Sequence, residues 1–173
     1  MRRSEFEGEF SRLYMPLGMY ALRVTGAADV AEDLVQDAFL KAWVYMEDGC
    51  EIQNFTAFMY RTVRNVCVSY LRTLHQTVGE DAVLDIADED SEVGKDEIDT
   101  SFRDARIWQV IDELPARCRE VFLRSKRDGL SNEQIADEMG ISVKTVKNQM
   151  TKAYSRLRQA LDPIHKPFFL PFL

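Results

Sequence analysis

The sequence is poor in the residues that build disulfide frameworks, turn-rich sheets and histidine-based sites. It has three cysteines in 173 residues, an odd number without C-x-x-C spacing, which disfavours a disulfide framework or a zinc site. Eight glycines and five prolines are too few for a turn-rich β-sandwich or barrel. The chain has only two histidines, so a metal site or a catalytic triad built on imidazole groups is disfavoured.

Long apolar segments are also lacking. No apolar run approaches the roughly 20 residues needed to cross a bilayer. The first stretch, MRRSEFEGEF, has no apolar core of the kind that signal peptides have, so we expect a cytoplasmic protein. Hydrophobic residues make up 46% and charged residues 29% of the chain, a balance typical of a folded protein.

The net charge of −7 is concentrated in one short segment. Residues 76–100 carry ten acidic residues and one lysine, whereas residues 101–173 have a net charge of +4. Residues 52–79 hold three arginines and no acid, and residues 140–161 hold five lysines and arginines and no acid. Because nucleic-acid binding needs local basic surface, the acidic average does not exclude it.

Apolar residues recur at helical spacing, and no segment alternates with period two. The pattern predicts helices over about residues 4–24, 29–45, 55–74, 102–113 and 115–126, followed by two short ones. Asp29, with Glu32 at the capping-box position, is expected to cap the second helix, and Pro115 to occupy the first position of the fifth. The predicted fold class is all-α, with two small helical domains joined by an acidic linker.

The predicted organisation has four parts, which are residues 1–75, a linker at 76–100, a second domain at 101–163 and an apolar tail at 164–173. The linker is interpreted as a solvated segment, with one helical turn near residues 82–86. The apolar tail is expected either to cover a groove on the second domain or to bind a partner.

Residues 130–157 satisfy the template of a helix-turn-helix. Ser131 is placed to cap one helix, with Gln134 at the capping-box position, and Gly140 supplies the backbone freedom for a tight turn. Ser142 is placed to cap a recognition helix beginning at Val143. The predicted inward face of that helix contains Val143, Val146, Met150, Ala153, Tyr154 and Leu157.

The opposite face of this helix suits a DNA major groove. Lysine can contact guanine edges or phosphates, asparagine suits adenine, and hydroxyl groups make adaptable hydrogen bonds. The predicted DNA-binding residues are Ser142, Lys144, Thr145, Lys147, Asn148 and Lys152.

The helix expected over residues 55–74 also sorts into two faces. Its predicted buried face contains Met59, Val63, Cys67, Tyr70, Leu71 and Leu74. The other face combines basic and amide groups with an aromatic ring, which suits unstacked bases, although a merely solvated face has the same pattern. The predicted nucleic-acid contacts are Phe58, Arg61, Arg64, Asn65, Ser69 and Arg72.

The helix expected over residues 29–45 places apolar residues among acids on the side away from its core face. The residues concerned are Asp33, Gln36, Asp37, Leu40 and Val44. This mixture indicates a protein partner with a basic, partly apolar surface. The alternative is that Leu40 and Val44 pack under the first helix.

Over about residues 4–162 the chain resembles an RNA polymerase sigma factor of the extracytoplasmic-function (ECF) type in the sigma-70 family. Three stretches carry the resemblance: DVAEDLVQDAFLKAW, FTAFMYRTVRNVCVSYLR and LPARCREVFLRSKRDGLSNEQIADEMGISVKTVKNQMTKAYSRLRQAL. Phe58 and Ser69 stand where many members carry Trp and Asp.

The resemblance implies a non-enzymatic factor that binds core RNA polymerase, carries it to promoter DNA and opens the duplex. Residues 1–75 would be sigma domain two and residues 101–163 sigma domain four. Within the second helix, Asp33–Trp43 would bind core polymerase. The Tyr45–Asn54 loop and the Arg61/Asn65 face of the third helix would read the downstream promoter element, and the recognition helix would read the upstream element. The resemblance also implies a membrane-anchored anti-sigma factor and no cofactor, metal or small-molecule substrate.

Two rival functions remain at this stage. A stand-alone helix-turn-helix regulator explains the second half of the chain but leaves residues 1–75 without a role. A DNA-processing enzyme such as a serine recombinase would need a clustered nucleophile. Ser4 and Ser11 lie near arginines but have no paired acid site.

Overall fold

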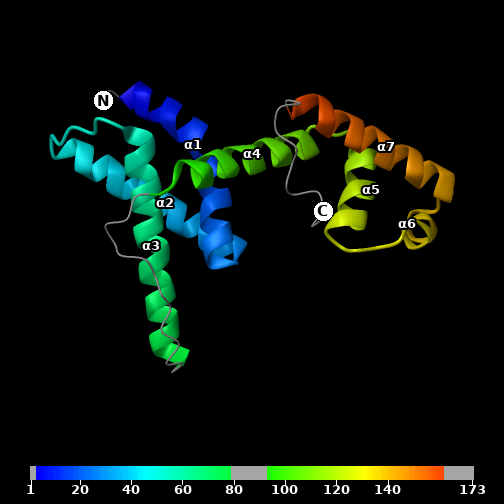
Figure 1. Cartoon of the computed structure of the whole chain (residues 1–173), viewed down its shortest axis with the longest axis horizontal. Coiled ribbons are helices and arrows are strands. Elements are labelled where there is room, and N and C mark those ends of the chain that lie inside the picture. Colours follow the sequence, from blue (N-terminus) through cyan, green and yellow to red (C-terminus); the bar gives the residue numbers. More distant parts are fainter. Residues whose placement is uncertain (1–2, 79–92, 162–173) are drawn as a thin grey trace. The chain divides into compact units, whose positions relative to one another are not determined.

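The computed structural model describes residues 3–78 and 93–161, with residues 75–78 described in their backbone only. All regular elements in these ranges are helices, which confirms the all-α prediction (Figure 1). They are α1 (Arg3–Thr25), α2 (Ala28–Glu47), α3 (Phe55–Val78), α4 (Lys95–Asp112), α5 (Ala116–Lys126), α6 (Asn132–Met139) and α7 (Val143–Ala160). By internal contacts the chain divides into a first unit, Met1–Ala105, and a second unit, Arg106–Leu173. No helix within the described ranges is both long and apolar enough to cross a membrane.

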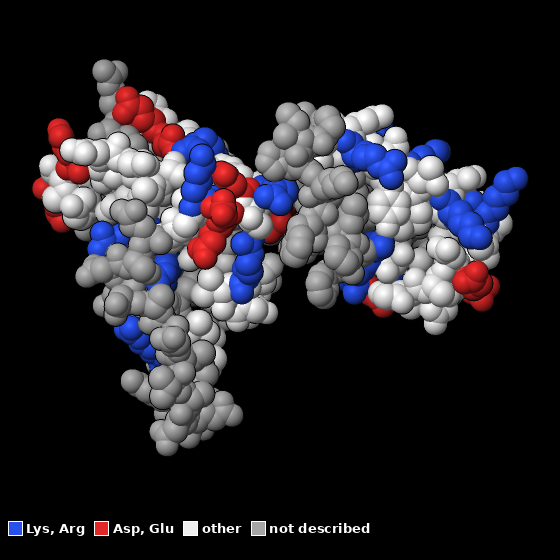
Figure 2. Space-filling model, viewed as in Figure 1, with Lys and Arg blue, Asp and Glu red and all other residues white. Residues whose placement is uncertain are grey.

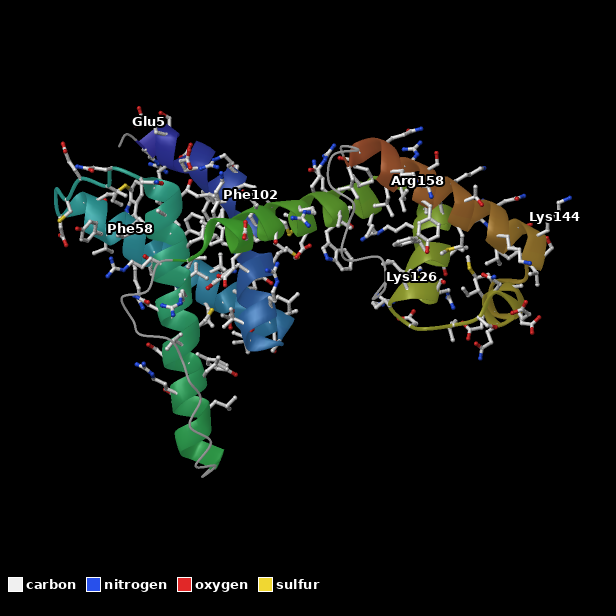
Figure 3. All side chains as sticks on the ribbon, in the orientation of Figure 1. Glu5, Phe58, Phe102, Lys126, Lys144 and Arg158 are labelled. Carbon is white, nitrogen blue, oxygen red and sulfur yellow. The ribbon has the colours of Figure 1, made fainter. Side chains whose placement is uncertain are left out.

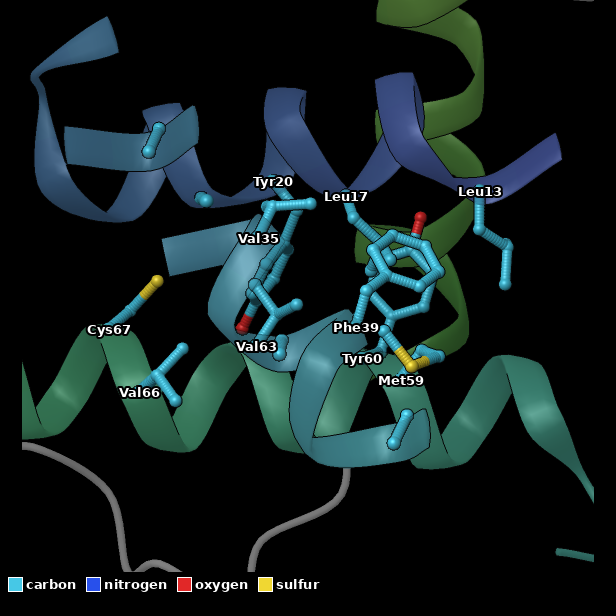
Figure 4. Close-up of a cluster of buried hydrophobic side chains, with 14 of the residues drawn as sticks. Leu13, Leu17, Tyr20, Val35, Phe39, Met59, Tyr60, Val63, Val66 and Cys67 are labelled. Carbon is cyan, nitrogen blue, oxygen red and sulfur yellow. The ribbon is translucent and has the colours of Figure 1, made fainter. Parts of the chain in front are cut away.

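The core of the first unit lies where α1, α2 and α3 pack against one another. Figure 4 shows that all three helices contribute apolar side chains to this cluster. Leu17, Val35 and Val63, one from each helix, are at most 1% exposed. Each such side chain stabilises the fold by about 1.5–3 kcal/mol relative to an exposed one.

The turn between α1 and α2 is held by Thr25 and Gly26. Gly26 has φ of +72°, and the Thr25 hydroxyl accepts a hydrogen bond from the Ala27 N–H at 3.4 Å. Ala27 is the N-cap residue of α2 and makes no side-chain cap. The prediction that Asp29 caps this helix is therefore wrong, since Asp29 lies in the first turn, where its charge suits the helix dipole.

Helix α4 begins at Lys95, so the predicted start at residue 102 is wrong. Asp96 and Glu97 stand in its first turn, where acids favour a helix start, and Ile98 and Phe102 pack against the first core. Asp96 and Glu97, interpreted from the sequence as part of a solvated linker, thus lie in the first turn of a helix. Ile98 and Phe102 hold this helix on the first core. Residues 79–92, with the predicted turn at 82–86, and the tail at 164–173 lie outside the described residues.

In the second unit α5 and α6 both pack on α7. The Cys118 thiol donates a hydrogen bond to the Gln149 carbonyl at 3.3 Å, which joins α5 to α7. The Lys126 ammonium lies 5.5 Å from the centre of the Tyr154 ring. Pro115 is the N-cap residue of α5 rather than its first helical residue, a difference of one position from the prediction.

Candidate nucleic-acid and protein interfaces

The turn of the helix-turn-helix has the predicted capping geometry. Ser131 Oγ accepts a hydrogen bond from the Gln134 N–H at 3.2 Å, and Gln134 Oε1 accepts one from the Ser131 N–H at 2.9 Å. Gly140 ends α6 with φ of +61°, a conformation that costs glycine little. The capping box and the glycine turn predicted from the sequence are confirmed.

Helix α7 starts as predicted, with Ser142 as its N-cap. Ser142 Oγ accepts a hydrogen bond from the Thr145 N–H at 3.1 Å, and the two hydroxyl groups are hydrogen-bonded at 2.8 Å. Thr145 is half-buried. Of the predicted DNA contacts, Ser142 and Thr145 are thus two whose hydroxyl groups already help to fix the start of the helix.

The remaining predicted contacts on α7 lie on its exposed face. Lys144, Lys147, Asn148 and Lys152 are all exposed, whereas Val146, Ala153 and Leu157 are buried. Helix α7 contains no acidic residue, and Figure 2 shows basic side chains spread over it. Lys144 projects from the first turn, as Figure 3 shows. This face has the donors and the charge that a major-groove reader requires.

The position of α6 beneath α7 is fixed by packing and by charge. Val121, Ile135, Ala136 and Val146 form a buried cluster that joins α5, α6 and α7. Arg124 of α5 pairs with Glu120 at 3.0 Å and also with Glu138 of α6. Apolar packing thus holds the recognition helix α7 on α5 and α6, and the ion pair between Arg124 and Glu138 joins α5 to α6.

On α3 the predicted nucleic-acid residues divide by exposure. Arg61, Ser69 and Arg72 are exposed, and Phe58, Arg64 and Asn65 are half-buried. Asn65 is more enclosed than predicted, because its Oδ1 is buried and has no hydrogen-bond partner among the described residues. These residues lie along one side of α3 but at different depths.

The predicted buried face of α3 is right only in its first half. Met59, Val63 and Cys67 are buried, Tyr70 and Leu71 are half-buried, and Leu74 is 44% exposed. Cys67 is the last α3 residue of the core cluster, and α3 extends eleven residues further, to Val78. The apolar residues of α3 therefore keep their helical spacing beyond the part of α3 that packs in the core cluster with α1 and α2. Burial raises the pKa of the Cys67 thiol to about 11, so this thiol is protonated at neutral pH.

A pocket of about 480 Å³ lies beside the start of α3. Asn54 Oδ1 accepts a hydrogen bond from the Ala57 N–H at 3.1 Å and so fixes the first turn of this helix. The rings of Tyr45 and Phe58 lie 5.3 Å apart, inclined at 31°, and both line the pocket together with Arg61. Figure 3 shows Phe58 at this end of α3. Aromatic rings next to a guanidinium suit an unstacked base with its phosphate.

Tyr45 entered the sequence prediction only through the resemblance, as the first residue of the Tyr45–Asn54 loop that would read the downstream promoter element. It is 44% exposed at the end of α2, and the pocket brings it together with residues of α3. The signal available in the sequence was an aromatic residue directly before the polar loop at residues 47–54.

The outer face of α2 is open to solvent. Leu40 is 63% exposed and Val44 49% exposed, so the alternative in which they pack under α1 is wrong. Asp33, Gln36 and Asp37 are also exposed. Gln36 Nε2 donates a hydrogen bond to the Tyr14 hydroxyl at 3.3 Å, which links this face to α1.

Comparison with known proteins identifies the family. Residues 10–77 match the model of Sigma-70 region 2, and residues 104–157 match that of Sigma-70, region 4. The ECF RNA polymerase sigma factor SigL of Mycobacterium tuberculosis is 32% identical over 151 residues, which cover 86% of this chain and 84% of SigL. The chain belongs to the ECF sigma factors. As a member of the sigma-70 family it is a transcription initiation factor that directs RNA polymerase to promoters.

Other sigma factors are similar over most of this ECF sigma factor. SigZ of Bacillus subtilis is 25% identical over 156 residues, covering 90% of this chain and 86% of SigZ. A solved structure of RpoE with the anti-sigma factor NepR, from Bartonella quintana, is 24% identical with a TM-score of 0.39, covering 93% of this chain and 99% of RpoE. CnrH, solved in complex with the cytosolic domain of CnrY, is 21% identical with a TM-score of 0.38, covering 93% of this chain and 90% of CnrH.

Proposed function

We propose that this ECF sigma factor uses three separate surfaces in transcription initiation. The exposed face of α2, with Asp33, Gln36, Asp37, Leu40 and Val44, binds core RNA polymerase. The Phe58 pocket, which is lined by Tyr45, Phe58 and Arg61, holds the displaced strand of the downstream promoter element, aided by the polar side of α3. The outer face of α7 reads the upstream element as duplex.

One observation carries this assignment. The pocket beside Tyr45 and Phe58 lies in the first unit, far along the chain from the helix-turn-helix, and it includes the cationic side chain of Arg61. A stand-alone helix-turn-helix regulator has no use for a second nucleic-acid surface of this kind. A factor that opens DNA needs one, because unstacking a base costs a few kcal/mol that new contacts must offset.

The proposal includes partners and the absence of catalysis. The ECF family resemblance favours a membrane-anchored anti-sigma factor as regulator and the cytoplasm as the site of action. No step of the proposed mechanism makes or breaks a covalent bond in the sigma factor, so the protein acts as a binding factor and not as an enzyme, without cofactor, metal or small-molecule substrate.

Promoter opening by reconstituted holoenzyme tests the assignment. Run-off transcription on fragmented genomic DNA with core polymerase first supplies a promoter. Permanganate footprinting then compares the parent with Arg61→Ala on duplex template and on a template mismatched at the downstream element. Arg3→Ala is the matched control, since the Arg3 side chain is 83% exposed on α1.

We expect Arg61→Ala holoenzyme to form, to bind the promoter and to open the duplex poorly. Transcription should recover on the mismatched template, because that template needs no strand separation. If Arg61→Ala opens duplex as well as the parent and the control do, the polar side of α3 is only solvated.

A further inference from the structure

The segment after the linker forms one wall of the Phe58 pocket. Val93 and Ile98 line this pocket together with Phe58 and Arg61. Both residues fall between the two family matches, which end at residue 77 and begin again at residue 104. The surface proposed to receive a DNA strand is therefore partly built from a segment outside the region 2 match.

A buried hydrogen-bond chain holds this segment on α3. The Ser101 hydroxyl donates to the Ile98 carbonyl at 2.8 Å, so the Tyr60 hydroxyl is left to donate to Ser101 Oγ. Tyr60 and Ser101 are both 0% exposed. Since Tyr60 also lines the Phe58 pocket, this hydrogen bond ties the segment to a residue of the pocket itself.

Two further contacts join the same segment to α1. The Arg23 guanidinium pairs with the Asp104 carboxylate at 2.7 Å, and the Asp104 side chain is only 13% exposed. The Arg12 guanidinium lies 5.8 Å from the centre of the Phe102 ring. Val93, Ile98 and Phe102 are only half-buried, so moving the segment aside exposes less apolar surface than opening the fully buried core would.

The charge on the segment opposes nucleic acid. Asp96, Glu97 and Asp99 are exposed in the first two turns of α4, next to Ile98. Carboxylates beside Ile98 raise the negative charge near one wall of the pocket, whose lining already includes Glu51, and so disfavour a phosphate near Arg61. The segment thus contributes apolar side chains to the pocket wall and acidic ones beside it.

We propose that residues 93–105 are an intramolecular cover on the Phe58 pocket, which the displaced DNA strand must move aside. The inference rests on the proposed function of that pocket. In the free protein the cover is docked and binding of single-stranded DNA is weak. Promoter opening couples entry of the strand to release of the cover.

Strand binding by the free protein, without polymerase, tests the cover. The open-cover variant is Ile98→Ser with Asp104→Asn, which removes one apolar contact and one ion pair. Met15→Ser with Asp29→Asn, the control, likewise replaces an apolar side chain by serine and an aspartate by asparagine, at exposed positions of α1 and α2. The probe is a fluorescein-labelled, random-sequence single-stranded DNA of about 12 nucleotides, followed by fluorescence anisotropy.

We expect the open-cover variant to bind this DNA about tenfold more tightly than the parent and the control. A docked cover that leaves about 10% of the protein open weakens apparent affinity by this factor. Adding Arg61→Ala to the open-cover variant should abolish the gain. Equal or weaker binding, binding by neither protein, or a gain that survives Arg61→Ala would each overturn the cover.

Hydrogen exchange gives a second measurement that needs no variant. Amide protons of residues 95–105 in the parent should lose protection when the single strand is added at saturating concentration, whereas those of α5 should not. Unchanged protection overturns the cover even if strand binding occurs. The footprinting of Arg61→Ala holoenzyme decides the function of the pocket separately, because the cover is intact there.

Discussion

The Tyr60 hydroxyl on α3 is hydrogen-bonded to the hydroxyl of Ser101 on α4, 41 positions later in the chain. Both hydroxyl groups are buried, and Ser101 donates its own hydrogen bond to the Ile98 carbonyl. Without Ser101 the Tyr60 hydroxyl loses its acceptor, whereas without Tyr60 the Ser101 hydroxyl keeps its hydrogen bond to Ile98. The hydrogen bond itself therefore adds little to the free energy of unfolding. Its main effect is to restrict which residues are tolerated at positions 60 and 101.

Ser101→Ala is expected to destabilise the protein by about 1–3 kcal/mol, because it leaves the Tyr60 hydroxyl buried without an acceptor. Adding Tyr60→Phe to Ser101→Ala should restore part of this loss, since both polar groups are then gone. Urea unfolding of the two single variants and the double variant measures the coupling. Strict additivity would show that the two hydroxyl groups do not depend on each other.

Stability is expected to fall in alkaline solution. Burial raises the pKa of Tyr20 from 10.0 to about 12 and also raises the pKa of Tyr60, so the folded state keeps protons that the unfolded state releases. The contribution is complete below about pH 10 and is lost as the pH rises towards 12. Burial of Cys67, whose pKa rises to about 11, acts in the same direction.

Tyr20→Phe should make this alkaline loss less steep. Urea unfolding at a series of pH values above 9 gives the slope of the unfolding free energy against pH for parent and variant. Tyr45→Phe, a change at a ring that is 44% exposed, is the control. An unchanged slope for Tyr20→Phe would mean that this tyrosine ionises in the folded protein as it does in the unfolded chain.

Leu40→Ala should weaken binding to core polymerase by about 1 kcal/mol or more, because it removes an apolar contact at the centre of the α2 face. Its melting temperature should change little, since Leu40 is 63% exposed in the free protein. Fluorescence titration of core polymerase and thermal unfolding measure the two quantities, with Met15→Ala as an exposed apolar control on α1. A large fall in melting temperature with intact affinity would instead place Leu40 in the core.

The recognition helix should contain contacts of two kinds. Lys152→Ala, at a predicted phosphate contact, should weaken binding to all DNA sequences. It should also reduce the slope of log affinity against log salt concentration by about one. Asn148→Ala and Lys144→Ala, at predicted base contacts, should cost about 1–3 kcal/mol on the correct promoter and little elsewhere. Holoenzyme titrations at several salt concentrations separate the two classes, and equal losses for all three variants on every sequence would contradict base reading by α7.

The sequence predicted best where local chemistry decides the structure. The caps at Ser131 and Ser142 and the glycine turn at Gly140 each depend on neighbouring residues, and all three are found as predicted. The cap expected at Asp29 failed because a turn built from Thr25 and Gly26 sets the helix start earlier.

Tertiary contacts account for what the sequence did not predict. The spacing of Leu74 is that of a buried residue, but Leu74 is 44% exposed and lies outside the core cluster that the described residues form. The acids at residues 96–99 indicated a solvated linker, and only the packing of Ile98 and Phe102 on the first core shows why a helix forms there. The Phe58 pocket likewise joins residues that are distant in sequence.

The division of α4 between the two units bears on how sigma factors can be recombined. Its residues to Ala105 belong to the first unit and those from Arg106 to the second, although the region 4 match already begins at residue 104. A chimera joined directly after the region 2 match would give the first unit a foreign segment in place of Val93 and Ile98. The natural exchange point of this chain is therefore inside a helix, because the wall of the Phe58 pocket extends beyond the segment by which region 2 is recognised.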